Sequence, residues 1–204
     1  MKIIVLGGFL GAGKTTVLMP LARYLIERAA GSAEYPVVIL ENEISEAGVD
    51  NQLLRQNSFT VENIFAGCIC CTSSAALIYG VREIREKYDP SWLLIEATGM
   101  ADPGKIAGEL EGEGFKAGIL ALADAKRWRR MRLALETFIR QQMEKADVIL
   151  LNKVDIAKPE DIDSAEAELH AFNPQAMVLR TCALEEKDVD FWGRIVSRLD
   201  KEAV

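Results

Sequence analysis

The chain has 204 residues, of which 50% are hydrophobic and 27% charged, so we expect one domain spanning residues 1–204 with a full core. These proportions exclude disordered and collagen-like chains. No stretch approaches the roughly 18–20 apolar residues of a membrane span, and no signal peptide is evident, which predicts a cytoplasmic protein with no membrane partner. The net charge of −7, from 24 basic and 31 acidic residues, repels phosphate backbones and argues against nucleic acid as a partner.

Short apolar runs alternate with amphipathic helical patterns along the chain, which is typical of an α/β fold whose mainly parallel sheet carries helices on both faces. The predicted strands are Lys2 to Leu6, Pro36 to Leu40, Trp92 to Glu96, Gly118 to Ala123, Val148 to Leu151 and Met177 to Thr181. Helices are predicted to begin near Lys14, Thr72, Arg127, Pro159 and Phe191. Two irregular stretches, Glu41 to Gly67 and Gly99 to Gly118, follow predicted strands, so we expect them as loops at the ligand-binding edge of the sheet.

The segment Gly7 to Thr16 contains a glycine, four residues and then Gly13-Lys14-Thr15, which is the P-loop pattern. It lies between a predicted strand and a helix, where backbone N–H groups and the positive helix end converge on phosphates. We expect Lys14 to neutralise phosphate oxygens and Thr15 to bind Mg²⁺. The expected phosphate-binding residues are Gly8, Gly11, Ala12, Gly13, Lys14, Thr15 and Thr16. The pattern predicts a three-layer P-loop NTPase fold that binds and hydrolyses a nucleoside triphosphate.

Three of the four cysteines crowd into Cys68-Ile69-Cys70-Cys71. Three thiolates supply soft ligands to a transition metal such as zinc, cobalt or copper(I), and they leave one position open. An open site suits delivery, whereas a structural zinc site would need a fourth ligand; the alternative is that these cysteines are small buried side chains. Cys182 is expected to be a buried or loop thiol, and the single histidine, His170, has no assigned role.

The segment Lys126 to Arg132 holds five cations and Trp128. It could contact nucleic acid or an acidic partner, but the favoured interpretation is the solvated face of a helix. Helical spacing predicts that the opposite face is buried, and its members are Trp128, Met131, Leu135 and Phe138.

Asn152-Lys153-Val154-Asp155 directly follows a predicted strand, on the same edge as the P-loop. The Asp155 carboxylate can accept hydrogen bonds from N1–H and the exocyclic amino group of guanine, whereas adenine has no proton on N1. We expect Asn152 to hold the base edge and Lys153 to lie along its face. Thr181 to Ala183 could add a backbone donor to the guanine oxygen. The segment therefore predicts a preference for GTP.

Several motifs in one order resemble the CobW-like metallochaperones of the CobW/HypB/UreG family of P-loop GTPases, over nearly the whole chain. The motifs are Gly7 to Thr16, Asn42 to Asp50, Gly67 to Cys71, Leu94 to Pro103 and Asn152 to Asp155. The resemblance implies a GTPase with a client metalloprotein and a nucleotide-dependent homodimer, and zinc or cobalt is the expected metal. Mg²⁺-dependent GTP hydrolysis is expected to be slow because no arginine finger is evident. The resemblance also implies that Glu96 binds Mg²⁺ or orients water, and that Glu43 and Glu46 are oxygen ligands for either metal.

Order and disorder of the loops on both sides of the cysteines could couple GTP hydrolysis to metal release. An alternative within the resemblance is a GTP-dependent chaperone of a cofactor enzyme, such as a corrinoid enzyme, with structural or redox cysteines. A small-molecule kinase is a third possibility. Two features depart from the family: Ile44 and Ser45 replace its usual Phe-Gly, and the chain stops at Val204, before the family's usual C-terminal domain.

Overall fold

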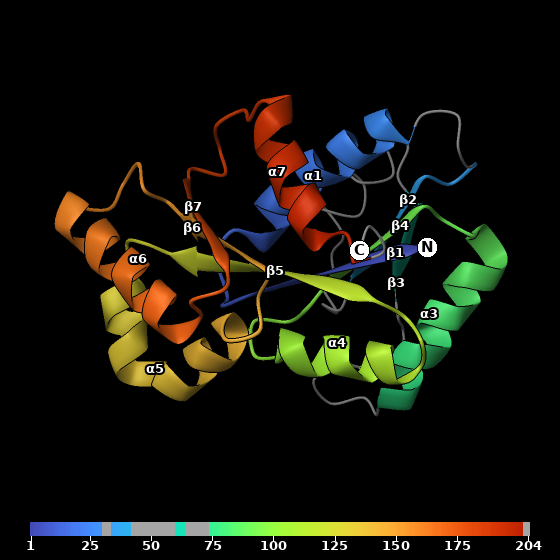
Figure 1. The fold of residues 1–204 in the computed structure, drawn as a ribbon, viewed down its shortest axis with the longest axis horizontal. Helices are drawn as coiled ribbons and strands as arrows, with labels where there is room; N and C mark the ends of the chain where they lie inside the picture. The colour runs from blue at the N-terminus through green and yellow to red at the C-terminus, as the bar shows by residue number, and fades with distance from the viewer. Residues whose placement is uncertain (30–33, 42–59, 64–73, 202–204) are drawn as a thin grey trace.

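The structure is a computed structural model that describes residues 1–29, 34–41, 60–63 and 74–201. Its centre is a seven-stranded sheet in the order β3-β2-β4-β1-β5-β6-β7, and all six neighbouring pairs are parallel (Figure 1). The strands are β1 (Lys2–Gly8), β2 (Val37–Glu41), β3 (Thr60–Asn63), β4 (Trp92–Glu96), β5 (Ala117–Asp124), β6 (Val148–Asn152) and β7 (Met177–Thr181). The helices are α1 (Lys14–Arg28), α3 (Ser74–Tyr88), α4 (Pro103–Gly112), α5 (Trp128–Met143), α6 (Pro159–Phe172) and α7 (Val189–Leu199).

The helices form two layers, with α1 and α7 on one face of the sheet and α3, α4, α5 and α6 on the other (Figure 1). Successive side chains of a strand point to opposite faces, so β1 contributes Ile4 and Leu6 to the α1/α7 core and Ile3 and Val5 to the second core. Burial on both faces explains why the strands read as continuous apolar runs. The predicted three-layer α/β architecture is confirmed, with all six predicted strands present.

Two elements lie inside stretches that the sequence analysis predicts as irregular, so that prediction is wrong there. β3 lies within Glu41 to Gly67, which makes Trp92–Glu96 the fourth strand along the chain and not the third. α4 lies within Gly99 to Gly118 and has a recognisable start: Asp102 accepts hydrogen bonds from the N–H groups of Gly104 (2.8 Å) and Lys105 (3.2 Å).

The predicted apolar face of α5 is wrong beyond its midpoint. Trp128 is buried and Met131 packs against the core, but Phe138 is 40% exposed and Ile139 is buried in its place. A helix of 3.6 residues per turn that starts at Trp128 returns to the same face near residue 139, so Ile139, and not Phe138, continues the buried face. The helix is also kinked at Leu135, whose φ of −140° and ψ of 35° lie outside the helical region.

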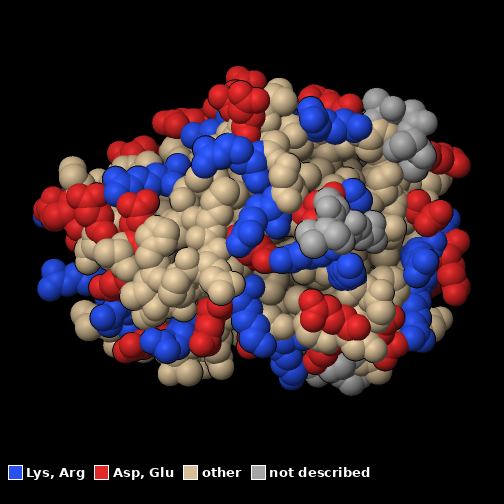
Figure 2. All heavy atoms as spheres, in the orientation of Figure 1, with Lys and Arg blue, Asp and Glu red and all other residues tan. Residues whose placement is uncertain are grey.

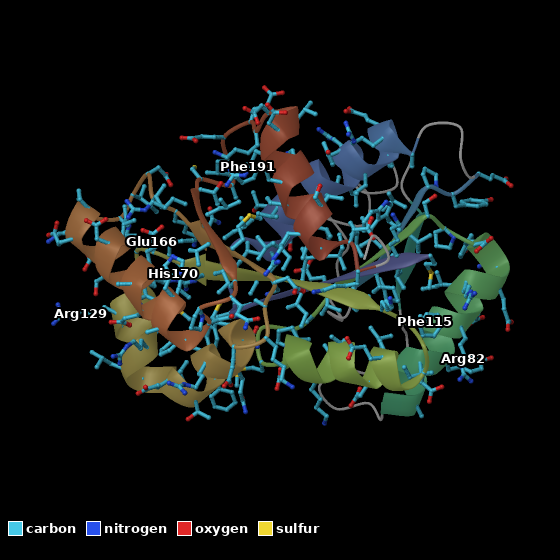
Figure 3. All side chains as sticks on the ribbon, in the orientation of Figure 1. Arg82, Phe115, Arg129, Glu166, His170 and Phe191 are labelled. Atoms are coloured by element: carbon cyan, nitrogen blue, oxygen red, sulfur yellow. The ribbon has the colours of Figure 1, made fainter. Side chains whose placement is uncertain are left out.

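Strand β7 forms one edge of the sheet and carries a charged group on its outer side. The exposed Arg180 guanidinium donates hydrogen bonds to Glu166 (2.5 Å) and Asp163 (2.7 Å) of α6. These two carboxylates raise the pKa of Arg180 above its ordinary value. Figure 3 shows Glu166 on α6. The pairing ties the edge strand to the helix that covers it.

Acidic and basic side chains are interspersed over the face shown in Figure 2.

Within the described part of the chain, no helix has both the length and the apolar character that a membrane span requires.

Candidate functional site

The turn between β1 and α1 has the backbone shape of a phosphate cradle. Gly8, Gly11 and Gly13 have φ values of 132°, 72° and 104°, which favour glycine. A Cβ on Gly13 would lie 2.5 Å from the Asn152 side-chain nitrogen, so a larger residue could not occupy this position. The turn therefore needs its glycines both for conformation and for close packing against the loop after β6.

Lys14 and Thr15 open α1 beside the end of β4. The Lys14 side chain is buried, and its Nζ donates to the carbonyl oxygen of Gly8 at 3.0 Å. The Thr15 hydroxyl lies 3.2 Å from Oε1 and 3.4 Å from Oε2 of Glu96. A hydroxyl next to a carboxylate is the hard-oxygen donor set that Mg²⁺ prefers, so this pair fits the predicted magnesium site.

Asn152 connects the P-loop to the loop that follows β7. Its side chain is buried, donates to the carbonyl oxygen of Ala12 (2.8 Å) and accepts from the N–H of Ala183 (2.8 Å). The Asn152 side chain, predicted to hold the base edge, is thus hydrogen-bonded within the protein. The Ala183 N–H that it binds belongs to the segment Thr181 to Ala183, which was predicted to face the guanine oxygen. In this structure Asn152 therefore braces two loops, and Ala12 contributes its backbone oxygen to that brace.

Lys153 and Asp124 form a charged link beneath the P-loop. The Lys153 ammonium donates to the carbonyl oxygen of Gly11 (2.6 Å) and pairs with Oδ2 of Asp124 (2.8 Å), and Arg127 Nε pairs with the same oxygen (2.7 Å). Burial raises the pKa of Asp124, but hydrogen bonds from Lys153 and Arg127 outweigh this effect and hold that pKa below 3.8. Asp124 therefore remains ionised and fixes both cations against the cradle.

One cavity of about 410 Å³ unites the P-loop with the predicted base-binding segment. Nine predicted site residues line it: Gly11, Gly13, Lys14, Thr15, Thr16, Glu96, Asn152, Lys153 and Asp155. Gly8 and Ala12 contribute backbone oxygens to the surrounding bonds. The volume lies within the range of small-molecule sites. The two sequence motifs, 140 residues apart, thus share one site.

The predicted transition-metal ligands lie outside the described residues. These are Cys68, Cys70, Cys71, Glu43 and the weaker candidate Glu46. Within residues 1–29, 34–41, 60–63 and 74–201, no cluster of three or more potential metal ligands occurs. Cys182 is a buried free thiol beside the nucleotide cavity, and His170 is exposed in the last turn of α6 (Figure 3).

Two residues next to the site were missed by the sequence analysis. Gln142 of α5 is 2% exposed; its Oε1 accepts from the Gly8 N–H (2.6 Å), and its Nε2 donates to the Ala101 carbonyl oxygen. It therefore joins the P-loop to the loop after β4. The sequence feature that could have indicated Gln142 is a polar residue on the buried face of α5, next to Met143. The buried Thr98 hydroxyl, two residues after Glu96, has no hydrogen-bond partner within the part of the chain that the structure describes.

We expect the substitution Gln142→Leu to lower the free energy of unfolding by about 2–4 kcal/mol, because it leaves the Gly8 N–H and the Ala101 carbonyl buried without partners. Urea denaturation measures this change. Gln141→Leu is the matched control, since Gln141 is exposed on the same helix, and it should alter stability by less than about 0.5 kcal/mol. Equal effects of the two substitutions would contradict the bridging role of Gln142.

Comparison with known proteins agrees with this geometry. The family model of the CobW/HypB/UreG nucleotide-binding domain matches residues 2–180. The zinc chaperone YjiA of Escherichia coli K12 is 33% identical over 184 residues, covering 84% of this chain and 55% of YjiA. Zinc-regulated GTPase metalloprotein activator 1 of Dictyostelium discoideum is 26% identical over 223 residues, covering 89% of this chain and 46% of that protein. The chain thus spans about half the length of these relatives.

The fold is also found in a solved structure. The hydrogenase maturation factor HypB of Archaeoglobus fulgidus superposes with a TM-score of 0.69 at 19% identity, covering 97% of this chain and 89% of that one. The family match extends from β1 into β7 and so includes the P-loop, Glu96 and the Asn152–Asp155 segment. The chain therefore belongs to the CobW/HypB/UreG family of nucleotide-binding domains, as the resemblance of its motifs predicted.

Proposed function

We propose that the chain is a slow, Mg²⁺-dependent GTPase of the cytoplasm that carries a transition metal, zinc in the first instance, to a client metalloprotein. The observation that carries the nucleotide part is the single cavity shared by Lys14, Thr15, Glu96 and Asp155. The names of the relatives YjiA and metalloprotein activator 1 support the metal and the client.

For hydrolysis, we assign the phosphates to the P-loop N–H groups and to Lys14, whose ammonium would exchange its bond to Gly8 for phosphate oxygens. Thr15 and Glu96 would hold Mg²⁺, which neutralises phosphate charge when bound. We assign the orientation of the attacking water to Glu96, which lines the cavity, and to the nearby Thr98 hydroxyl, which has no hydrogen-bond partner among the described residues. No arginine with a free side chain lines the described cavity, which supports the expectation of slow turnover.

The sheet order supports a link between the nucleotide and the metal. β3, β2, β4 and β1 are consecutive neighbours, and Glu41 at the end of β2 is in register with both Asn63 of β3 and Glu96 of β4. Cys68 follows Asn63 by five residues, a reach of at most about 18 Å. Glu43 follows Glu41 by two. In sequence, the candidate metal ligands thus follow strands whose carboxyl ends lie on the same side of the sheet as Thr15 and Glu96.

On this basis we propose that Cys68, Cys70 and Cys71 bind zinc in the GTP state, with Glu43 as an oxygen ligand, and release it after hydrolysis. Three thiolates suit zinc and leave one position for a ligand from the client. Loops that change with the nucleotide would alter this ligand set. A nucleotide-dependent homodimer is part of the same proposal.

Zinc affinity tests this proposal. It is measured by competition with a chromophoric chelator, with the thiols reduced, in Mg²⁺ plus a non-hydrolysable GTP analogue and again in Mg²⁺-GDP. We expect at least a tenfold difference, about 1.4 kcal/mol of coupling. Replacing Cys68, Cys70 and Cys71 by serine should abolish the difference in zinc affinity. The control substitution Cys182→Ala removes a buried thiol directly after β7 and should retain the difference. Equal affinities in the two nucleotide states would favour the chaperone of a cofactor enzyme instead.

A further inference from the structure

The cations at the start of α5 divide into two groups. Arg127 pairs with Asp124 (2.7 Å), and Arg132 pairs with Glu168 of α6 (2.5 Å), so these two arginines serve the fold. The other cations of Lys126–Arg132 are exposed and form no ion pair with a described residue; they are Lys126, Arg129 and Arg130. Figure 3 shows Arg129 extending from α5 beyond the body of the protein.

The fold adds a fourth cation from a distant part of the chain. Lys158, directly before α6, joins Lys126, Arg129 and Arg130 around an open groove of about 640 Å³. Lys158 is also exposed and has no ion pair with a described residue. The groove is lined by one carboxylate, Asp161, and by the side chain of Leu133, which is 75% exposed. We call this surface the α5–α6 groove.

The charge of this groove is opposite to that of the chain. Four cations and one acid surround it, although the protein has a net charge of −7 and the face in Figure 2 mixes both signs. Like charges that surround one hollow repel one another, and binding an acidic ligand relieves that repulsion. The exposed Leu133 offers an apolar contact that a ligand with charged groups alone would not use.

We propose that the α5–α6 groove binds an acidic segment of a partner protein. Such a segment supplies carboxylates for the four cations and an apolar side chain for Leu133, and its backbone N–H groups can meet the Asp161 carboxylate. Nucleic acid fits less well, because its sugar-phosphate backbone has no N–H donor for Asp161 and no aliphatic side chain for Leu133.

The position of the groove gives docking a route to the nucleotide site. Lys126 is adjacent in sequence to Arg127, whose guanidinium donates to the Leu10 carbonyl of the P-loop (2.9 Å) and pairs with Asp124. A partner in the groove thus lies one residue from a P-loop contact. The proposal nevertheless does not depend on the GTPase assignment, because binding to the groove can be measured without nucleotide.

Fluorescence anisotropy with the full chain tests the proposal, using a fluorescein-labelled peptide of glutamate and leucine residues as probe. The test variant is Arg129→Glu with Arg130→Glu. The control carries the same change in net charge at two exposed cations outside the groove, Lys116→Glu with Arg194→Glu. Circular dichroism checks that both remain folded. We expect the test variant to bind at least tenfold more weakly than the unmodified chain and the control to bind within about twofold of it, with binding weakened by salt.

Three results would overturn the proposal. Equal weakening in both double variants would show that only net charge matters. Tighter binding of a DNA oligonucleotide of equal charge would assign the groove to nucleic acid. Self-association lost in the Arg129/Arg130 variant, without peptide binding by the unmodified chain, would assign it to a second copy. Retained binding in an Arg129→Lys, Arg130→Lys variant would support the electrostatic origin of recognition.

Discussion

The substitution Lys14→Ala should lower the rate of GTP hydrolysis by about 100- to 1000-fold, or about 2.7–4 kcal/mol of transition-state stabilisation. The Lys14 ammonium is buried at the cradle and is the cation placed to neutralise charge that develops on the phosphates. Alanine supplies no charge, and the P-loop N–H groups alone would remain. Phosphate release under saturating Mg²⁺-GTP measures the rate.

Lys116→Ala provides the control for this substitution, because Lys116 is exposed outside the cavity, and its turnover should match that of the unmodified chain. Circular dichroism and thermal unfolding establish that the Lys14 variant is folded. Full turnover in a folded Lys14→Ala chain would overturn the assignment of the cavity as a GTPase site, whatever its affinity for nucleotide.

The second large effect concerns the choice of base. We expect Asp155→Asn to weaken GTP binding by about 10- to 100-fold, because the carboxylate that we propose accepts two guanine protons would be replaced by an amide with a donor facing the exocyclic amino group. Xanthosine triphosphate carries an oxygen where guanine has that amino group, so the same variant should bind it more tightly than the unmodified chain does.

Competition against a fluorescent guanine nucleotide measures both affinities, with Asp190→Asn as the control at an exposed aspartate of α7. A gain for xanthosine triphosphate together with a loss for GTP is a result that simple unfolding cannot produce. An unchanged ratio of the two affinities would remove Asp155 from base recognition and leave the P-loop as the sole nucleotide contact.

The architecture could be predicted from the sequence because each central strand is buried on both faces and so appears as an apolar run. β3 escaped prediction because its four residues, Thr-Val-Glu-Asn, contain a single aliphatic side chain. α4 escaped because five glycines follow Gly99 up to Gly118, three of them within the helix, and suggested a loop, although Asp102 followed by Pro103 is a recognisable helix start.

The parts of the candidate site that are defined by local sequence could be predicted. The contacts that depend on how distant segments pack together could not. The glycine spacing around Lys14 and the position of Asn152 after a strand were sufficient to place both motifs on one edge. The bonds from Gln142 to Gly8 and Ala101 join three distant segments, so only the folded chain shows them. The exposed Phe138, by contrast, could have been predicted, because a period of 3.6 residues counted from Trp128 reaches Ile139.

The pairing of Arg180 with Asp163 and Glu166 also bears on the protection of an edge strand against aggregation. β7 ends the sheet, and an edge strand presents unpaired backbone groups to which a strand of another molecule can add, a common first step of aggregation. The Arg180 guanidinium and its two carboxylates place a hydrated, charged cluster beside that edge. An incoming strand would have to displace this water and separate the ions, so the cluster protects the open side of the sheet.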